Sequence, residues 1–242
     1  MQPDSSSDLG FGLKHRQALQ IVRPDPPIDP LSARTYGEDP RALRGILALC
    51  QPSSRYHRNR VIFFEGDPAD YFFFVSRGSV RTCRSFKDGK RSVVVFHVVF
   101  EFVGLEGEMT HSLSAEAATD TTVLPLKRSA VLATAVHDRR ISDFLRISMA
   151  KELRRQREHT ALIGRSAQCR LATFLIDLSV RTGKTENLDL PMSHQDIADY
   201  VGLSIETVSR AITEFERSGF VIRMSTRSVI LRDRNALLRI MA

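Results

Sequence analysis

The chain has 242 residues, of which 42% are hydrophobic and 26% are charged, a composition typical of a globular protein with one large or two ordinary domains. It lacks a run of ~18 apolar residues and an N-terminal basic segment followed by an apolar block, so we expect no membrane span, no secretory signal and a cytoplasmic location. The net charge of +7, carried mainly by arginine, favours an anionic partner without identifying one.

The three cysteines, Cys50, Cys83 and Cys169, lie far apart in the sequence. No Cys-x-x-Cys pair is present, so the sequence gives little support to a zinc or iron–sulfur site. We therefore expect no metal and no cofactor.

The composition and the hydrophobic pattern change several times along the chain. Residues 1–37 are rich in Pro, Asp, Ser and Arg, which predicts a flexible arm. A short helix capped by Asp39 follows. From about residue 55 to 126, short β-branched and aromatic runs alternate with turn signals such as Lys87-Asp88-Gly89-Lys90. This alternation predicts an antiparallel β-roll within a sensor-like domain at 38–128.

Residues 129–163 contain no proline and are predicted to form one helix of about 30 residues, too long for an ordinary surface helix. Apolar residues recur near a 3.5-residue period, which is typical of a coiled coil between two copies of a chain. The simpler alternative is an amphipathic helix docked on the roll. We expect a dimer seam that includes Ile141, Leu145, Met149 and Leu153.

The segment 164–242 is predicted to be a winged helix-turn-helix domain. In HQDIADYVGLSIETVSRAIT (194–213), Ser193 and Ser204 are candidate caps of two helices, and Asp196 stands three residues after the first cap. Gly202 fits a turn that needs positive φ, and Ala198 is small where the helices would cross. Agreement at so many positions favours a helix-turn-helix over an ordinary helical hairpin.

The second helix presents Glu206, Ser209, Arg210 and Thr213 on one face, opposite the apolar residues that pack inward. Arginine can bind guanine O6 and N7 in the major groove, and glutamate can accept from cytosine N4. Glu206 and Arg210 are also spaced to form a surface ion pair. We expect this face, with Ser204 at the helix start, to read DNA.

Residues 219–231 are predicted to form a two-stranded wing. Arg223 and Arg227 near its tip are candidate phosphate contacts, which add affinity but no sequence information. A solvated turn with no contact to DNA is the alternative.

The sequence resembles the CRP/FNR superfamily of transcription regulators in RVIFFEGDPADYFFFVSRGSVR (60–81), the long helix and ETVSR (206–210). Residues 104–123 and the Glu206-x-x-Ser209-Arg210 triplet look most like the FixK-like branch. The resemblance implies a cytoplasmic homodimer that binds double-stranded DNA and RNA polymerase. It also implies an activator of genes for microaerobic or anaerobic life, including nitrogen fixation. We expect an inverted repeat of the TTGA…TCAA type.

Two departures from the family bear on its ligands. Leu105 follows Gly104 where cyclic-AMP-binding members carry Glu, and Leu113-Ser114 replaces their Arg-Ser pair, so a cyclic phosphate would lose its counter-charge. No cysteine cluster precedes Cys50, in contrast to oxygen-sensing FNR proteins. We expect neither a cyclic nucleotide nor an iron–sulfur cluster. Residues 97–104 (HVVFEFVG) also lack the usual Pro-Gly-Asp turn, which leaves the local loop geometry open.

Cys169 is a candidate redox switch because the resemblance places it near the DNA backbone at a helix start, between Arg165 and Arg170. Positive charge favours the thiolate, and an oxidised, acidic group there would repel phosphate. A cysteine that only packs against a neighbouring helix is the alternative.

Three other functions fit the sequence less well. An enzyme is disfavoured because His57, His97 and His111 show no metal-ligand spacing. A regulator gated by a small molecule in the roll is the main alternative. An architectural, sequence-neutral DNA binder is disfavoured because a glutamate facing DNA repels phosphate unless it reads a base.

Overall fold

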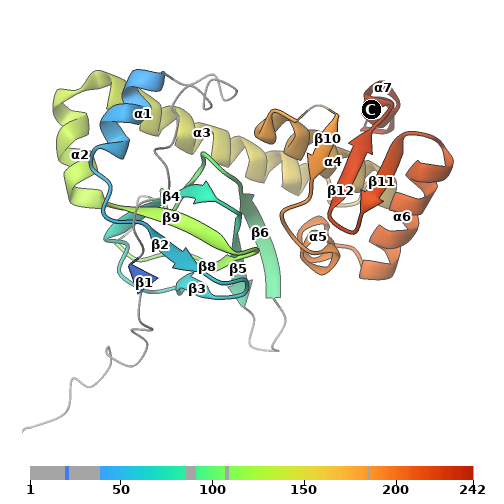
Figure 1. Cartoon of the computed structure of the whole chain (residues 1–242), viewed down its shortest axis with the longest axis horizontal. Coiled ribbons are helices and arrows are strands. Elements are labelled where there is room, and N and C mark those ends of the chain that lie inside the picture. The colour runs from blue at the N-terminus through green and yellow to red at the C-terminus, as the bar shows by residue number, and fades with distance from the viewer. Residues whose placement is uncertain (1–19, 22–38, 86–90, 107–108, 185, 242) are drawn as a thin grey trace, which may run out of the picture.

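A computed structural model of the chain describes residues 20–21, 39–85, 91–106, 109–184 and 186–241. It has two lobes, and a long helix runs from one lobe to the other (Figure 1). Apart from residues 20–21, the arm expected at 1–37 lies outside the described residues, as does the turn expected at 87–90.

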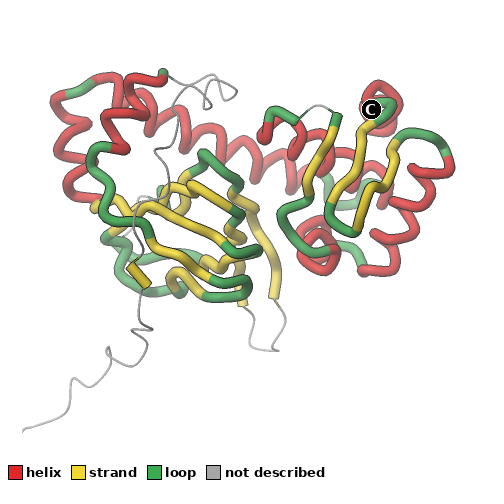
Figure 2. The backbone as a smooth tube through the Cα atoms, in the orientation of Figure 1, coloured by secondary structure: helices red, strands yellow, loops and turns green. Residues whose placement is uncertain are grey.

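The first lobe is the expected antiparallel β-roll. Its strands gather into two sheets, drawn yellow in Figure 2, with the orders β1-β2-β9-β4-β7 and β3-β8-β5-β6. The buried side chains of Phe63, Val75 and Val123 lie in one apolar cluster to which both sheets contribute. The strands are β1 (Gln20–Ile21), β2 (Ser54–Tyr56), β3 (Val61–Phe63), β4 (Tyr71–Arg77), β5 (Val80–Ser85), β6 (Arg91–His97), β7 (Phe102–Val103), β8 (Ser114–Ala117) and β9 (Thr121–Lys127).

The expected 30-residue helix is in fact two helices, α2 (Arg128–His137) and α3 (Arg139–Ala161). The break lies at Asp138, which is extended at φ −118° and ψ 101°. Its carboxylate accepts a hydrogen bond from the Arg140 N–H at 2.9 Å, so Asp138 acts as the N-cap of a new helix. The single-helix prediction was therefore wrong at this point.

Helix α1 (Pro40–Leu47) packs against α3, and Asp39 caps it as expected. Ile141 and Leu145 of α3 are 2% and 5% exposed and lie in the same apolar cluster as Leu43 of α1. Their side chains are thus covered by their own chain. The expectation that they line a dimer seam is corrected, because they have almost no surface left for a partner.

A different face of α3 is open to solvent. Met149 and Leu153 are 38% and 49% exposed. They belong to a row in which the spacing alternates between four and three residues, as in a coiled-coil seam. We call this row the exposed stripe of α3; it consists of the exposed residues Ser142, Arg146, Met149, Leu153 and Thr160 and of the partly buried Gln156.

The second lobe is a winged helix-turn-helix domain. Its sheet has three strands in the order β10-β12-β11, so β10 joins the two-stranded wing that the sequence predicted. Buried Leu171, Leu188, Ile197 and Phe215 contribute to its core. Its elements are α4 (Ala167–Thr182), β10 (Asn187–Asp189), α5 (His194–Val201), α6 (Ile205–Arg217), β11 (Val221–Ser225), β12 (Ser228–Leu231) and α7 (Arg234–Met241).

The two lobes pack against each other where α5 meets β6. Phe96 of β6 lies 5.3 Å from Tyr200 and 6.2 Å from Phe174, measured between ring centroids. One buried apolar cluster therefore includes residues of both lobes. Within the described part of the chain, every helix is too short or too polar to cross a membrane.

Candidate DNA-binding interface

Helices α5 and α6 form the predicted helix-turn-helix. Ser193 and Asp196 make a reciprocal capping box at the start of α5, and the Ser204 hydroxyl accepts from the Thr207 N–H at the start of α6. Gly202, in the turn between them, has φ +67°, a conformation that disfavours residues with a Cβ. The signals read from the sequence are confirmed at each of these positions.

The outer face of α6 is open to solvent. Ser204, Glu206, Ser209, Arg210 and Thr213 are all exposed. The Arg210 guanidinium donates to the Thr207 hydroxyl at 3.3 Å. Hydrogen bonds from the backbone and from Ser204 lower the pKa of Glu206, and the charge of Arg210 lowers it further. This face therefore presents an ionised carboxylate and a guanidinium one helical turn apart.

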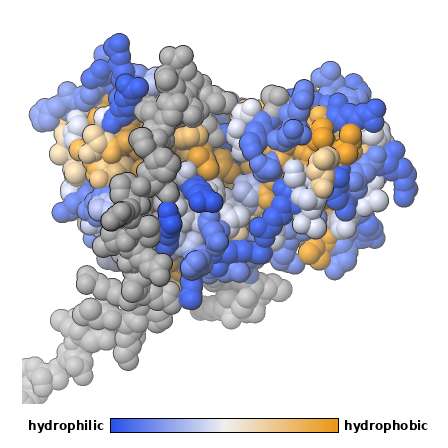
Figure 3. Space-filling model, in the orientation of Figure 1, coloured by the Kyte–Doolittle hydropathy of each residue, from blue (hydrophilic) through white to orange (hydrophobic). Residues whose placement is uncertain are grey.

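The wing places a second cation beside this face. Arg223 of β11 forms an ion pair with Glu216 of α6 at 2.9 Å and donates to the Thr213 hydroxyl at 3.4 Å. Arg227, in the turn between β11 and β12, is exposed. On the side shown in Figure 3, hydrophilic side chains cover much of this lobe, with apolar side chains between them.

His194 is a candidate that the sequence analysis missed. It opens α5 directly after the cap Ser193, and burial and the charge of Arg223 both lower its pKa. Its imidazole is thus near the wing arginine although 29 positions separate the two residues. Only the fold brings them together, so the sequence carried no signal for this pair.

The structure changes the expected surroundings of Cys169. Its side chain is 3% exposed in the first turn of α4. Arg165 donates to the Met241 carbonyl at 3.0 Å, and Arg170 donates to the carbonyls of Val201 and Gly202 at 3.2 and 3.1 Å. Both arginines thus bind backbone oxygens, and the thiol faces the protein interior. The sequence predicted that these two arginines activate the thiol near the DNA backbone, but the structure turns both guanidinium groups to carbonyls elsewhere and buries the thiol.

The interior of the β-roll is filled by its own side chains near Gly104. The His111 ring is 3% exposed and stacks on Phe63 at 3.6 Å, while its Nδ1 lies 3.2 Å from Glu106. Leu105 is buried in the apolar cluster that includes α1. No group of three His, Cys, Asp or Glu residues is placed to hold a metal ion among the residues described.

Arg128 binds the backbone of residues 104–106. Its guanidinium donates to the backbone carbonyls of Ala69 and Glu106, each at 2.6 Å, and of Gly104, at 3.1 Å. It also lies 4.6 Å over the Phe72 ring. The chain therefore satisfies carbonyls of this segment with its own cation.

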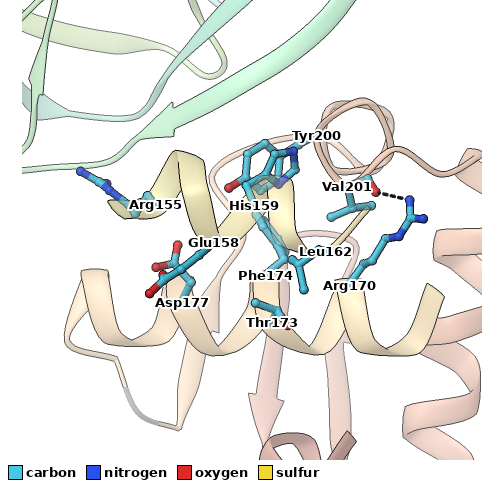
Figure 4. A pocket seen from close by; sticks show the side chains of 10 residues that line it. All are labelled: Arg155, Glu158, His159, Leu162, Arg170, Thr173, Phe174, Asp177, Tyr200 and Val201. Atoms are coloured by element: carbon cyan, nitrogen blue, oxygen red, sulfur yellow. Dashed lines mark hydrogen bonds between the residues drawn. The ribbon is translucent and has the colours of Figure 1, made fainter. Parts of the chain in front are cut away.

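A pocket of about 30 Å³ lies where α3, α4 and α5 meet (Figure 4). His159 of α3 stacks on Tyr200 of α5 at 4.3 Å, and Arg170 of α4 reaches the Val201 carbonyl. This volume holds about one or two water molecules. The contact of α3 with α4 and α5 is thus closely packed.

A second pocket of similar size, between α3 and the roll, includes Glu152. Burial raises the pKa of its carboxyl to about 7, although the charge of Arg155 lowers it. The folded state therefore holds this proton more tightly than the unfolded chain does. Ionisation of Glu152 should cost folding free energy that is fully present above pH 7 and absent below the ordinary value of 4.5.

We therefore expect Glu152→Gln to stabilise the protein by about 3 kcal/mol at pH 8, and we expect this gain to vanish as the pH approaches 4.5. Denaturant unfolding of both proteins at the two pH values measures the difference. Glu158→Gln, at an exposed carboxylate on the same helix, is the control. An equal gain at both pH values would show that ionisation of Glu152 is not the cause.

A β-roll joined by a long helix to a winged helix-turn-helix whose second helix has an exposed polar face defines a two-domain, DNA-binding regulator. A model described as the cyclic nucleotide-binding domain matches residues 53–138, and one described as the Crp-like helix-turn-helix domain matches residues 169–240. The chain belongs to the CRP/FNR family of transcription regulators. Proteins of this family are regulators and not enzymes.

Within the family the chain is similar to proteins named FixK. It is 38% identical over 209 residues to the nitrogen fixation regulation protein FixK of Azorhizobium caulinodans, covering 84% of each chain. It is 39% identical over 185 residues to the FixK of Rhizobium meliloti, covering 75% of this chain and 83% of that one. The solved structure of FixK2 from Bradyrhizobium japonicum is 36% identical and matches with a TM-score of 0.75, over 80% of this chain and 98% of that one.

Proposed function

We propose that the protein is a homodimeric, sequence-specific transcription activator that binds an inverted repeat of the TTGA…TCAA type. The observation that carries this proposal is the exposed face of α6, where Glu206, Ser209 and Arg210 stand at positions from which a recognition helix reads bases. Two similar proteins are named nitrogen fixation regulation proteins. We extend that role, and control of microaerobic or anaerobic genes, to this chain.

Each polar residue of the interface has a proposed role. Arg210 reads a guanine, Glu206 accepts from the partnered cytosine or a neighbouring amine, and Ser209 contacts an adjacent base. Thr213 and Ser204 lie at the edges of the same face. Arg223, Arg227 and the newly recognised His194 contact phosphate and set the position of the domain on the duplex.

The exposed stripe of α3 supports a homodimer, and we propose from the family alone that this dimer acts in the cytoplasm. Met149 and Leu153 leave apolar surface open in the single chain, and a seam with a second copy would cover it. A two-fold dimer matches a palindromic site with half-sites about one helical turn apart. RNA polymerase is the further partner proposed, from the family alone.

The interior of the β-roll supports activity without an effector. His111 and Leu105 are buried at the segment where a charged ligand would need polar contacts, and Arg128 already donates to its carbonyls. Gating by an unidentified small molecule is the alternative. In that alternative the ligand would bind inside the roll and would have to displace side chains such as His111.

In vitro transcription tests the proposed function. Purified protein should activate a promoter that carries the inverted repeat, with no effector added, and millimolar cyclic AMP should change neither activation nor operator affinity. Activation only after addition of a cell extract depleted of protein would favour the gated alternative. Absence of activation in both cases, with binding intact, would contradict the activator role.

Redox control through Cys169 stays a prediction. Burial raises the pKa of Cys50 and Cys83 to about 12, so these thiols resist oxidation. Oxidation of Cys169 requires the first turn of α4 to open, because the thiol is buried.

Peroxide should abolish operator binding by the wild type, with an unchanged far-UV circular dichroism spectrum, and should spare Cys169→Ala. The physical reason is that a sulfinic or sulfonic acid at this position adds negative charge to the DNA-binding domain. If the alanine variant is equally sensitive, Cys169 is not the switch.

A further inference from the structure

The segment 97–104, which departs from the family pattern, forms an unusual turn at the junction of the two lobes. Phe100 has φ +74°, a conformation that is strained for a bulky residue and that persists only when its surroundings enforce it. The Phe100 N–H donates to the Val75 carbonyl at 2.9 Å, and the Val75 N–H donates to the Glu101 carbonyl at 2.9 Å. These hydrogen bonds to strand β4 fix the backbone of the turn and therefore the position of the Glu101 Cα atom.

The Glu101 carboxylate joins three parts of the molecule. Its Oε2 accepts from the Val98 N–H at 3.0 Å, within the turn. Its Oε1 accepts from Arg155 of α3 at 2.7 Å, and its two oxygens accept from Arg181 of α4 at 2.9 and 2.7 Å. One buried carboxylate thus connects the roll, the long helix and the DNA-binding domain.

The charges around Glu101 are balanced. Burial raises the pKa of Glu101, but Arg181 and Arg155 outweigh this effect and lower it to about 2, so the group is ionised at neutral pH. Arg181 also pairs with Asp177 at 3.0 Å and donates to the Phe96 carbonyl. Burial lowers the pKa of neighbouring His97 to about 4, which leaves the imidazole neutral.

A second buried ion pair joins the lobes at another point. Arg81 of β5 donates to Asp196 of α5 at 2.8 Å, and both side chains are 3% exposed. Arg91 of β6 reaches Asp196 and Asp199 at 3.2 and 3.3 Å. Two separate anchors restrict rotation of the DNA-binding domain as well as its distance from the roll.

Buried ion pairs add little net stability, but removal of one partner is costly and the charges tolerate few alternative arrangements. We propose that Glu101 is a positioning residue for operator binding, which holds the winged-helix domain on α3 and so sets the separation of the two recognition helices in the dimer. This inference rests on the proposed function. Glu101 contacts no DNA and acts through Arg155 and Arg181.

The test measures how strongly the protein prefers one half-site spacing. Binding is measured on a duplex whose half-sites lie about one helical turn apart, which we call the reference spacing. It is also measured on duplexes with spacers two base pairs longer and shorter, which rotate one half-site around the helix axis. Glu101→Gln keeps the shape of the side chain and removes its charge. We expect Glu101→Gln to lose at least tenfold in affinity for the duplex with the reference spacing and to change less than twofold in affinity for the other two duplexes.

Three further variants isolate the positioning role of Glu101. Arg155→Gln leaves the Glu101–Arg181 pair in place and should give a smaller loss of spacing preference, which keeps the test open if Glu101→Gln does not fold. Glu158→Gln removes an exposed pair with Arg154 on the same helix and should change nothing. Arg210→Ala should weaken binding on every spacing by the same factor.

An unchanged spacing preference in folded, dimeric Glu101→Gln or Arg155→Gln would overturn the positioning role. A wild type that binds none of the duplexes specifically would instead contradict the proposed function. The two failures are therefore distinguishable.

Discussion

Leu153→Asp should convert the protein to a monomer and weaken operator binding by at least about a hundredfold, because two linked DNA-binding domains gain that much from simultaneous binding. Leu153 is 49% exposed in the single chain, so the fold of the protomer should survive the substitution. A charge next to Met149 in the seam is costly to bury, because Met149 and Leu153 are the apolar residues of the exposed stripe. Sedimentation velocity measures the loss of the dimer.

Ile147→Asp is the matched control. Ile147 is an apolar residue of α3 with 40% exposure, but it lies on the side of the helix away from the exposed stripe. This variant should remain a dimer with wild-type affinity. A full-strength dimer in Leu153→Asp would place the interface elsewhere.

Arg210→Ala should weaken binding to the inverted repeat by about 1–3 kcal/mol and leave binding to random DNA nearly unchanged. The exposed guanidinium contributes affinity only where the groove offers guanine O6 and N7. Arg227→Ala is the control for a phosphate contact, because it should weaken both kinds of DNA equally and reduce the salt dependence.

Fluorescence anisotropy at fixed ionic strength measures both variants. If Arg210→Ala loses equal affinity on the repeat and on random DNA, then Arg210 contacts phosphate only. The role of α6 as the reading helix would then depend on another of its residues.

The helix-turn-helix could be predicted from the sequence because its signals are local. Ser193, Gly202 and Ser204 each satisfy a requirement of the backbone within a few residues, and the structure has them as predicted. The strands of the roll could be predicted for the same reason, since turns such as Glu65-Gly66-Asp67 separate short apolar runs.

The faces of α3 could not be predicted in the same way. Ile141 and Leu145 continue a heptad-like row with Met149 and Leu153, and the sequence contains nothing that separates residues facing the roll from residues facing solvent. The separation arises because α1 and the roll cover one side of the helix. The break at Asp138 was hidden because the segment contains neither proline nor glycine.

Contacts between residues far apart in the chain could not be predicted from the sequence either. Glu101 meets Arg181, and Arg81 meets Asp196, across 80 and 115 positions. Arg170 was expected to neighbour the Cys169 thiol, yet its guanidinium binds the carbonyls that end α5. The sequence indicates that buried charged residues need partners of opposite charge or carbonyl oxygens. The packing of the two lobes determines which partners are within reach.

Sequence-specific recognition of the inverted repeat can be measured by the anisotropy of a labelled TTGA…TCAA duplex, titrated with effector-free protein at fixed ionic strength. The competitor is a scrambled duplex of the same length and composition. We predict a dimer that binds the inverted repeat at least about a thousandfold more tightly than the scrambled sequence. Equal affinity for the two duplexes would contradict the proposed recognition.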